Sequence, residues 1–167
     1  MALLNLRFEP ITADTLATAY ALKRATVVDN TGDAAWLARI LPNRDAYARY
    51  VAHCQALGPA AAVLVYDGDT LVGNVDVGAY RPDPTVGYMF NIYITPAARG
   101  RGLGALLDDY AHQTLGAWGF RHLRLRTFGA NTATRRFYDA RGYTFLENAE
   151  LGMVVLGREI RAPAANT

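Results

Sequence analysis

The stretch from residue 91 to residue 116 limits most strongly what this chain can fold into. An apolar run typical of a strand, NIYI, leads through PAARGRGLG at residues 96–104 into a helix predicted for residues 102–116. The first N–H groups of a helix lack partners within it, and with the helix dipole they favour an anion. Glycines let a ligand approach closely, and Arg99 and Arg101 add charged donors. The loop is therefore either a surface turn or a phosphate site.

Two familiar phosphate loops fit this stretch poorly. The Walker pattern ends in Lys followed by Ser or Thr, and the loop contains no such pair. Gly100, Gly102 and Ala105 match the dinucleotide spacing, but that fingerprint expects an acidic residue about 20 positions later. Residues 122–126 read HLRLR and contain no carboxylate. The pattern therefore favours neither a nucleoside triphosphate nor a dinucleotide.

The composition is typical of a folded protein that binds neither membranes nor nucleic acid. Of 167 residues, 51% are hydrophobic and 19% are charged, and no apolar run approaches the ~20 residues that span a bilayer. The net charge of +2 is small for a nucleic-acid binder. The N-terminus lacks a secretory pattern and Cys54 is the single cysteine, so we expect a cytoplasmic protein. Residues 1–160 are expected to form one domain, and residues 161–167 a flexible tail.

Hydrophobic periodicity and turn residues predict a mixed sheet with helices, of the α/β (α+β) class. Strands are expected at residues 4–9, 61–66, 70–80, 86–94, 122–128, 143–146 and 151–159. Helices are expected from Thr12 or Asp14 to about residue 26, at 34–41, from Asn43 or Asp45 to 57, at 102–116 and at 132–141. The segment VVDNTGD at 27–33 reads as a loop, and Asp67-Gly68 as a hairpin turn. The early strands are expected to pair antiparallel.

Two motifs together resemble the GNAT family of N-acetyltransferases. Arg99-Gly100-Arg101-Gly102-Leu103-Gly104 fits the family's pattern [RQ]-x-x-G-x-[GA] for the pyrophosphate of coenzyme A. It follows Ile94-Thr95-Pro96, which matches the family's V-x-P strand ending. Downstream, NTATRRFYDARGY reproduces a second pattern with Asn131, Tyr138 and Gly142-Tyr143. The resemblance implies the acyl-CoA N-acyltransferase fold, with the first four strands antiparallel and strands 86–94 and 122–128 parallel and splayed apart.

The same resemblance implies transfer of an acetyl group from acetyl-CoA to a primary amine, by direct attack in a ternary complex without metal. The backbone of Ile92, Tyr93 and Ile94 would bind pantetheine, and a bulge in this strand would aim an N–H at the thioester carbonyl. The residues expected around the pyrophosphate are Arg99, Gly100, Arg101, Gly102, Leu103 and Gly104, with Asn131 near the pantetheine.

Tyr138 is the residue that the resemblance assigns as general acid for the departing thiolate, a role within reach of a phenol. Helical spacing groups Ala133, Phe137 and Ala140 on one face and places Tyr138 about 100° away, so that it need not belong to the core. The alternative is a structural tyrosine at the edge of the core.

No carboxylate in GYMFNIYI offers a general base, so the proton acceptor stays open. Asp76 on a neighbouring strand is one candidate, and Asp29 and Asp33 are candidates for acceptor binding. Residues 99–141 carry eight arginines against three aspartates, a net +5 that leaves −3 for the rest of the chain. This asymmetry favours an anionic donor and a cationic amine acceptor, although the arginines could simply be solvated.

The remaining polar candidates are assigned structural roles. Asp108 and His112 are expected to form an exposed helix pair, Cys54 to be buried and inert, and no histidine pair has metal-ligand spacing. The acceptor, a small molecule or a peptide, is left open. A non-catalytic acyl-CoA-binding regulator of the same fold is the alternative function. The apolar segment LGMVVLG could pair across the subunits of a homodimer.

Overall fold

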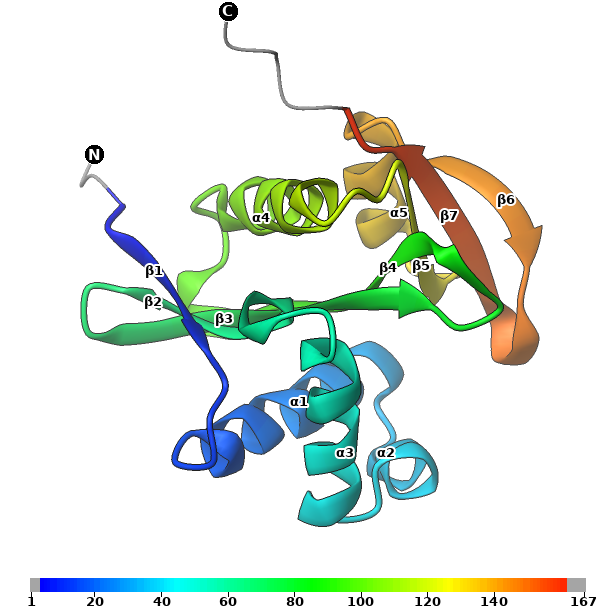
Figure 1. Ribbon diagram of the computed structural model, residues 1–167. Helices are drawn as coiled ribbons and strands as arrows, with labels where there is room; N and C mark the ends of the chain where they lie inside the picture. The colour runs from blue at the N-terminus through cyan, green and yellow to red at the C-terminus, as the bar shows by residue number, and fades with distance from the viewer. Residues whose placement is uncertain (1–3, 162–167) are drawn as a thin grey trace, which may run out of the picture.

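The computed structural model describes residues 4–161, apart from the side chains of residues 34 and 37. Within this range the strands form a single seven-stranded sheet in the order β1-β2-β3-β4-β5-β7-β6. Figure 1 shows α4 and α5 on one face of the sheet, and α1, α2 and α3 on the other. The strands are β1 (Leu6–Pro10), β2 (Ala62–Asp67), β3 (Thr70–Tyr80), β4 (Asp83–Ile94), β5 (His122–Phe128), β6 (Thr144–Asn148) and β7 (Met153–Glu159).

The helices follow the sequence pattern closely in number and order. They are α1 (Leu16–Thr31), α2 (Ala34–Ile40), α3 (Arg44–Gln55), α4 (Leu103–Ala117) and α5 (Thr132–Ala140), with short 3-10 turns η1 (Pro59–Ala61), η2 (Pro96–Ala98) and η3 (Glu150–Gly152). Asn43 caps α3 by accepting a hydrogen bond from the backbone N–H of Ala46. Of the predicted tail, residues 162–167 lie outside the described residues.

Strands β1 to β4 pair antiparallel, whereas β4 and β5 pair in parallel, as expected. The parallel pairing covers only Gly87–Leu123 to Met89–Leu125. Immediately afterwards β4 has an extra residue, because Asp76 and Val77 of β3 face Asn91 and Met89 and leave Phe90 unmatched. The predicted antiparallel-then-parallel sheet with two splayed strands is therefore confirmed.

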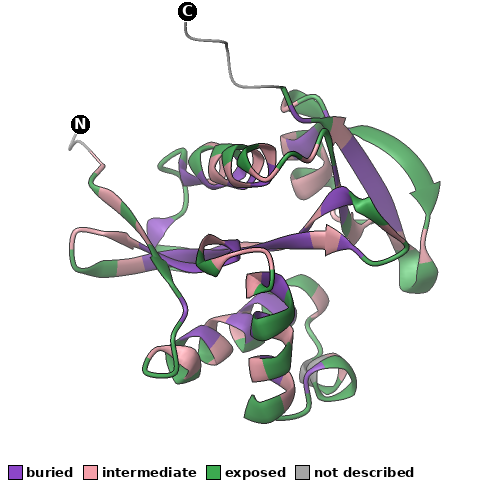
Figure 2. Cartoon of the chain, in the orientation of Figure 1, coloured by how far each residue is buried: buried purple, intermediate pink, exposed green. Residues whose placement is uncertain are grey.

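The core lies on both faces of the central strands, which explains why these strands are almost continuously apolar. Figure 2 shows the buried residues concentrated in β2, β3, β4 and the sheet-facing side of α4. Val63, Val65 and Val75 are completely buried. Leu107 of α4 and Cys54 of α3, on opposite faces of the sheet, are completely buried as well. The ends of β4 and β5 and the glycine loop after β4 are therefore attached to a well-packed sheet.

Two sequence predictions about local structure are wrong. The segment at residues 27–33 is not a loop, because α1 continues to Thr31 and ends only where Gly32 adopts a left-handed φ of 66°. Val27 packs into the core, so tertiary packing extends the helix. The apolar segment LGMVVLG cannot offer an edge to another subunit, since β7 is already paired with β5 and β6. The free edge at this end of the sheet is β6.

Candidate active site

A groove opens where β4 and β5 stop pairing. It has a volume of about 670 Å³. Most of the predicted donor-site residues line it, from β4, the glycine loop and α5: Ile92, Tyr93, Ile94, Arg99, Gly100, Gly104, Asn131 and Tyr138, together with Asp29 of α1. The structure therefore brings both sequence motifs to one place, although they are separated by about 30 residues of helix and strand.

The glycine loop leaves the start of α4 open. Gly100 and Gly102 have φ values of 76° and 77°, and a methyl group placed on either one would meet nothing beyond its chain neighbours within 4 Å. Gly102 is the N-cap of α4 and supplies no side chain to its first N–H groups. These donors and the positive end of the helix dipole fit a pyrophosphate. The Leu103 side chain is buried, so this residue can offer only its backbone.

The two arginines of the loop have different surroundings. Arg99 lines the groove and donates from Nε to the Ile94 carbonyl at 3.1 Å and from its terminal nitrogen to Asp29 at 2.8 Å. Arg101 instead donates to Asp67 at 2.5 Å, at the β2–β3 turn, and is not among the groove residues. The fixed guanidinium of Arg99 is thus the one placed for a phosphate oxygen.

Asp29 lies on the wall of this groove, in the last turn of α1. Its carboxylate accepts hydrogen bonds from Arg99 and from the Tyr93 hydroxyl, both at 2.8 Å. These bonds, that from Arg99 first, lower the pKa of Asp29 below its usual value. In this arrangement Asp29 is bound to Tyr93 and Arg99, two residues that the sequence assigns to coenzyme A binding.

Tyr138 is buried, with 9% of its surface exposed, and it is the buried residue of α5. The predicted apolar face of this helix is therefore wrong, since Ala133 and Ala140 are exposed. The ring of Tyr138 packs between Phe137 and Tyr143, with centroids 5.1 and 5.0 Å away. Burial, and then the charge of Asp108, raise the pKa of Tyr138, so its hydroxyl stays protonated at neutral pH.

A buried ion-pair network includes Tyr143, the residue whose ring packs against Tyr138. The predicted exposed pair of Asp108 and His112 is wrong, because Asp108 is fully buried on the sheet-facing side of α4. Its carboxylate accepts a hydrogen bond of 2.6 Å from the Tyr143 hydroxyl and another from Arg141. The His112 ring lies 2.9 Å from the same hydroxyl, and burial lowers its pKa. The network ties the turn after α5 to α4.

Asp76 is completely buried on the α1–α3 side of the sheet and is not among the groove residues. It accepts hydrogen bonds from the Tyr50 hydroxyl at 2.9 Å and from the Asn74 side chain at 3.2 Å. Burial raises the pKa of Asp76, and burial lowers the pKa of nearby Lys23. A direct contact between this carboxylate and an amine in the groove would require the surrounding residues to move.

Two further cavities adjoin the groove and contain residues that the sequence did not single out. One, of about 130 Å³, lies between the splayed strands and is lined by Asn30, Asn91 and Tyr138 among others. The other, of about 450 Å³, lies beside α1 and α2, where Trp36 meets Phe128 edge to face at 6.2 Å. Asn30 borders the groove and both cavities. Nothing in the sequence indicates that Asn30 lies at a site, because it is an exposed asparagine in a segment predicted to be a loop.

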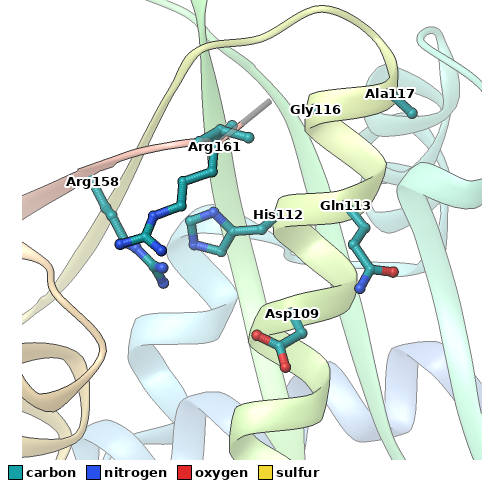
Figure 3. A pocket seen from close by; sticks show the side chains of 8 residues that line it. Asp109, His112, Gln113, Gly116, Ala117, Arg158 and Arg161 are labelled. Carbon is teal, nitrogen blue, oxygen red and sulfur yellow. The ribbon is translucent and has the colours of Figure 1, made fainter. Parts of the chain in front are cut away.

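A separate cavity of about 280 Å³ lies along the second half of α4 and the end of β7 (Figure 3). In Figure 3 the side chains of Arg158 and Arg161 lie beside the His112 ring. None of the predicted site residues lines this cavity.

Among residues 4–161, no group of three His, Cys, Asp or Glu side chains is arranged to hold a metal ion. In the same range no helix has the length and apolar character needed to cross a membrane.

Curated relatives share part of the chain. A mycothiol acetyltransferase of Beutenbergia cavernae is 36% identical over 63 residues, which cover 38% of this chain and 21% of that protein. Its counterpart from Geodermatophilus obscurus is 33% identical over 90 residues, 52% of this chain and 29% of that protein. The chain thus aligns with less than a third of the length of these relatives.

Solved structures match nearly the whole chain. The PaiA N-acetyltransferase of Thermoplasma acidophilum, solved with coenzyme A, is 12% identical with a TM-score of 0.77, covering 93% of this chain and 99% of that one. YncA of Salmonella typhimurium, solved with acetyl-CoA, is 16% identical with a TM-score of 0.71 and covers 99% of both chains. At these identities the likeness establishes the fold alone. The model of the acetyltransferase (GNAT) family matches residues 29–143, so the chain belongs to this family.

Proposed function

We propose that this protein transfers the acetyl group of acetyl-CoA to the primary amine of a small molecule or peptide. One observation carries the proposal. The groove lined by β4, the glycine loop and α5 runs from the open N-terminus of α4 to the buried ring of Tyr138, which bears a hydroxyl. An anion site at one end and a proton donor at the other are what a thioester of coenzyme A requires.

The donor site would be formed by backbone and side-chain donors that line the groove. The start of α4, with Arg99, would bind the pyrophosphate, and the β4 backbone at Ile92–Ile94, which β5 no longer pairs, would bind pantetheine. The Asn131 oxygen caps α5 by accepting from Thr134 at 3.1 Å, so its NH₂ is left to donate into the groove. The bulge at Phe90 would turn a backbone N–H toward the thioester carbonyl.

Tyr138 would act as the general acid. When the amine attacks the thioester carbon, an N–C bond forms, the C–S bond breaks and the sulfur leaves as a thiolate. The phenol proton of Tyr138 passes to this sulfur, and the proton released by the nitrogen returns through solvent. Its raised pKa keeps the hydroxyl protonated over the whole neutral range.

The acceptor would enter from the side of α1 and α2, where the cavity bordered by Trp36, Phe128 and Asp33 lies. A carboxylate beside two aromatic rings suits a cationic amine with an apolar part. Asp29 is a candidate for acceptor binding only if it leaves Arg99 and Tyr93. The single cysteine, free and buried, favours the cytoplasm, and a homodimer formed through the sheet would use the edge strand β1 or β6.

A thiol-release assay tests the proposal. The protein is incubated with acetyl-CoA and, in turn, benzylamine, tyramine, glucosamine, spermidine and an alanyl peptide, and the acetylated amine is identified by mass spectrometry. Release of free coenzyme A in a 1:1 ratio with acetylated amine supports the transferase. Tight acetyl-CoA binding without thiol release on any amine would instead favour a non-catalytic acyl-CoA-binding module.

A further inference from the structure

Four polar side chains form one hydrogen-bonded row beneath β3 and β4. Tyr50 of α3 donates to Asp76 Oδ2 at 2.9 Å, and Asn74 Nδ2 donates to the same oxygen at 3.2 Å. Asn91 Nδ2 in turn donates to Asn74 Oδ1 at 3.0 Å. Asp76 and Asn74 are fully buried, and Asn91 is 8% exposed. Burying polar groups is costly unless they are hydrogen-bonded, and within the row the Oδ1 atom of Asp76 is buried without a hydrogen-bond partner among the described residues.

The row has a fixed direction, which starts at Asp76. The Oδ2 atom of Asp76 accepts two hydrogen bonds, and Asn74 turns its NH₂ toward it. The carbonyl oxygen of Asn74 then faces Asn91, which must also present its NH₂. As a consequence, the carbonyl oxygen of Asn91 points away from the row, and no described residue donates a hydrogen bond to it.

This oxygen belongs to a residue at the opening between the two splayed strands. Asn91 lines the cavity of about 130 Å³, together with Ile92, Leu125, Thr134 and Tyr138. Asn91 lies on the α1–α3 face, because its pairing partner Asp76 contacts Tyr50 there. Tyr138 comes from α5 on the opposite face, as Figure 1 shows. The cavity thus joins the face of the proposed donor to the face of the proposed acceptor.

We infer that the Asn91 carbonyl oxygen accepts an N–H hydrogen bond from the attacking amine, and that Asp76 acts behind it as a positioning residue. The inference rests on the proposed function. An amide oxygen is too weak a base to take the proton, so Asn91 orients a neutral amine with its lone pair toward the thioester carbon. The proton that nitrogen loses still goes to solvent, and the sulfur is protonated by Tyr138.

The same geometry makes Asn91 a determinant of acceptor class. An amine N–H is a full hydrogen-bond donor to the Asn91 carbonyl oxygen, whereas a thiol S–H is a weak donor that leaves this oxygen poorly paired. A site built to accept a hydrogen bond discriminates against ligands that cannot supply one. We therefore expect amines to be strongly preferred over thiols as acceptors.

Asn91→Leu tests the contact, because leucine has nearly the same shape without polar atoms. With whichever of the five panel amines is turned over best, the variant is expected to lower kcat/KM for that amine about tenfold, the loss of one hydrogen bond. The Kd of acetyl-CoA, measured by calorimetry, should change less than about twofold. Asn91→Ala removes the same oxygen without added bulk and serves if the leucine variant does not fold.

Asp76→Asn tests the positioning role, because asparagine can donate to Asn74 and so reverse the row. Alone it should lower kcat/KM for the amine about two- to fivefold, and in the Asn91→Leu background it should have no further effect. Additive losses would overturn the positioning role, since a merely structural defect acts in either background. Unchanged amine kcat/KM in both Asn91 variants would overturn the contact while leaving the transferase intact. No thiol release by the unmodified protein with any panel amine would overturn the proposed function, and the inference with it.

Discussion

Asn91 and Tyr138 line one small cavity from opposite faces of the sheet, at the point where β4 and β5 separate. The cavity exists because the parallel pairing ends at Met89–Leu125 and the next residue of β4, Phe90, is a bulge. A bulge and an abrupt end of pairing are ways in which a sheet redirects side chains and exposes backbone donors. The following predictions ask whether this opening binds an acyl donor and supports its chemistry.

Arg99→Ala should raise the Kd of acetyl-CoA about three- to tenfold, because one charged hydrogen bond to a phosphate is lost at a half-exposed position. Calorimetric titration measures this change. Arg101→Ala is the matched control from the same loop, since its guanidinium is bound to Asp67. We expect that control to change the Kd less than about twofold. Equal losses in the two variants would show that the loop acts only through its overall charge.

Asp29→Asn should raise the KM for acetyl-CoA about two- to fivefold, because the carboxylate orients Arg99 through a partly exposed bond of 2.8 Å. The KM of the amine should stay within about twofold. Steady-state kinetics with each substrate varied in turn separates the two constants. A rise confined to the amine KM would assign Asp29 to acceptor binding instead.

Asp108→Asn should destabilise the fold by about 3–5 kcal/mol, because it leaves buried partners of a charged network without their carboxylate. Urea unfolding followed by circular dichroism measures the free energy. The neighbouring Asp109→Asn is the control, because its side chain is 53% exposed. It should cost less than about 1 kcal/mol. A loss in the Asp108 variant as small as that in the Asp109 control would show that the Asp108 carboxylate contributes little to the stability of the fold.

The stability of the protein should fall as the pH is lowered from 7.5 to 5.5. Burial lowers the pKa of His112 below its ordinary value, so below about 6.5 the unfolded chain binds a proton that the folded protein does not. The contribution of His112 to the free energy of unfolding is therefore complete above the pKa of this histidine in the unfolded chain, and it decreases as the pH falls below that pKa. His112→Gln should flatten this slope in urea titrations, whereas the exposed His122→Gln should not. An unchanged slope in the His112 variant would contradict the assignment.

The sequence predicts the parts of the fold and site that depend on nearby residues. The strand, glycine loop and helix from Ile92 to Ala117 follow from local periodicity, turn residues and unsatisfied N–H groups. The motif containing Asn131 and Tyr138 indicated the second half of the groove through its resemblance to the GNAT pattern. Both motifs meet in the structure.

The features that the sequence did not predict depend on contacts between distant segments. Residues Val27–Thr31 are helical, with Val27 packed into the core, although VVDNTGD reads as a loop. Asp108 is buried because Arg141 and Tyr143, more than 30 residues later, satisfy its carboxylate. The orientation of Asn91 depends on Asn74 and Asp76 of the adjacent strand. Helical or strand periodicity alone does not indicate which of these distant residues will be in contact.

Turnover of Tyr138→Phe tests the central claim most directly. The variant keeps the ring that packs against Phe137 and Tyr143 and removes only the hydroxyl. If Tyr138 protonates the departing thiolate, kcat for coenzyme A release should fall at least about 100-fold, the usual contribution of a general acid. The KM for acetyl-CoA should change less than about twofold. An unchanged kcat would contradict the account, because the proton would then reach the sulfur by another route.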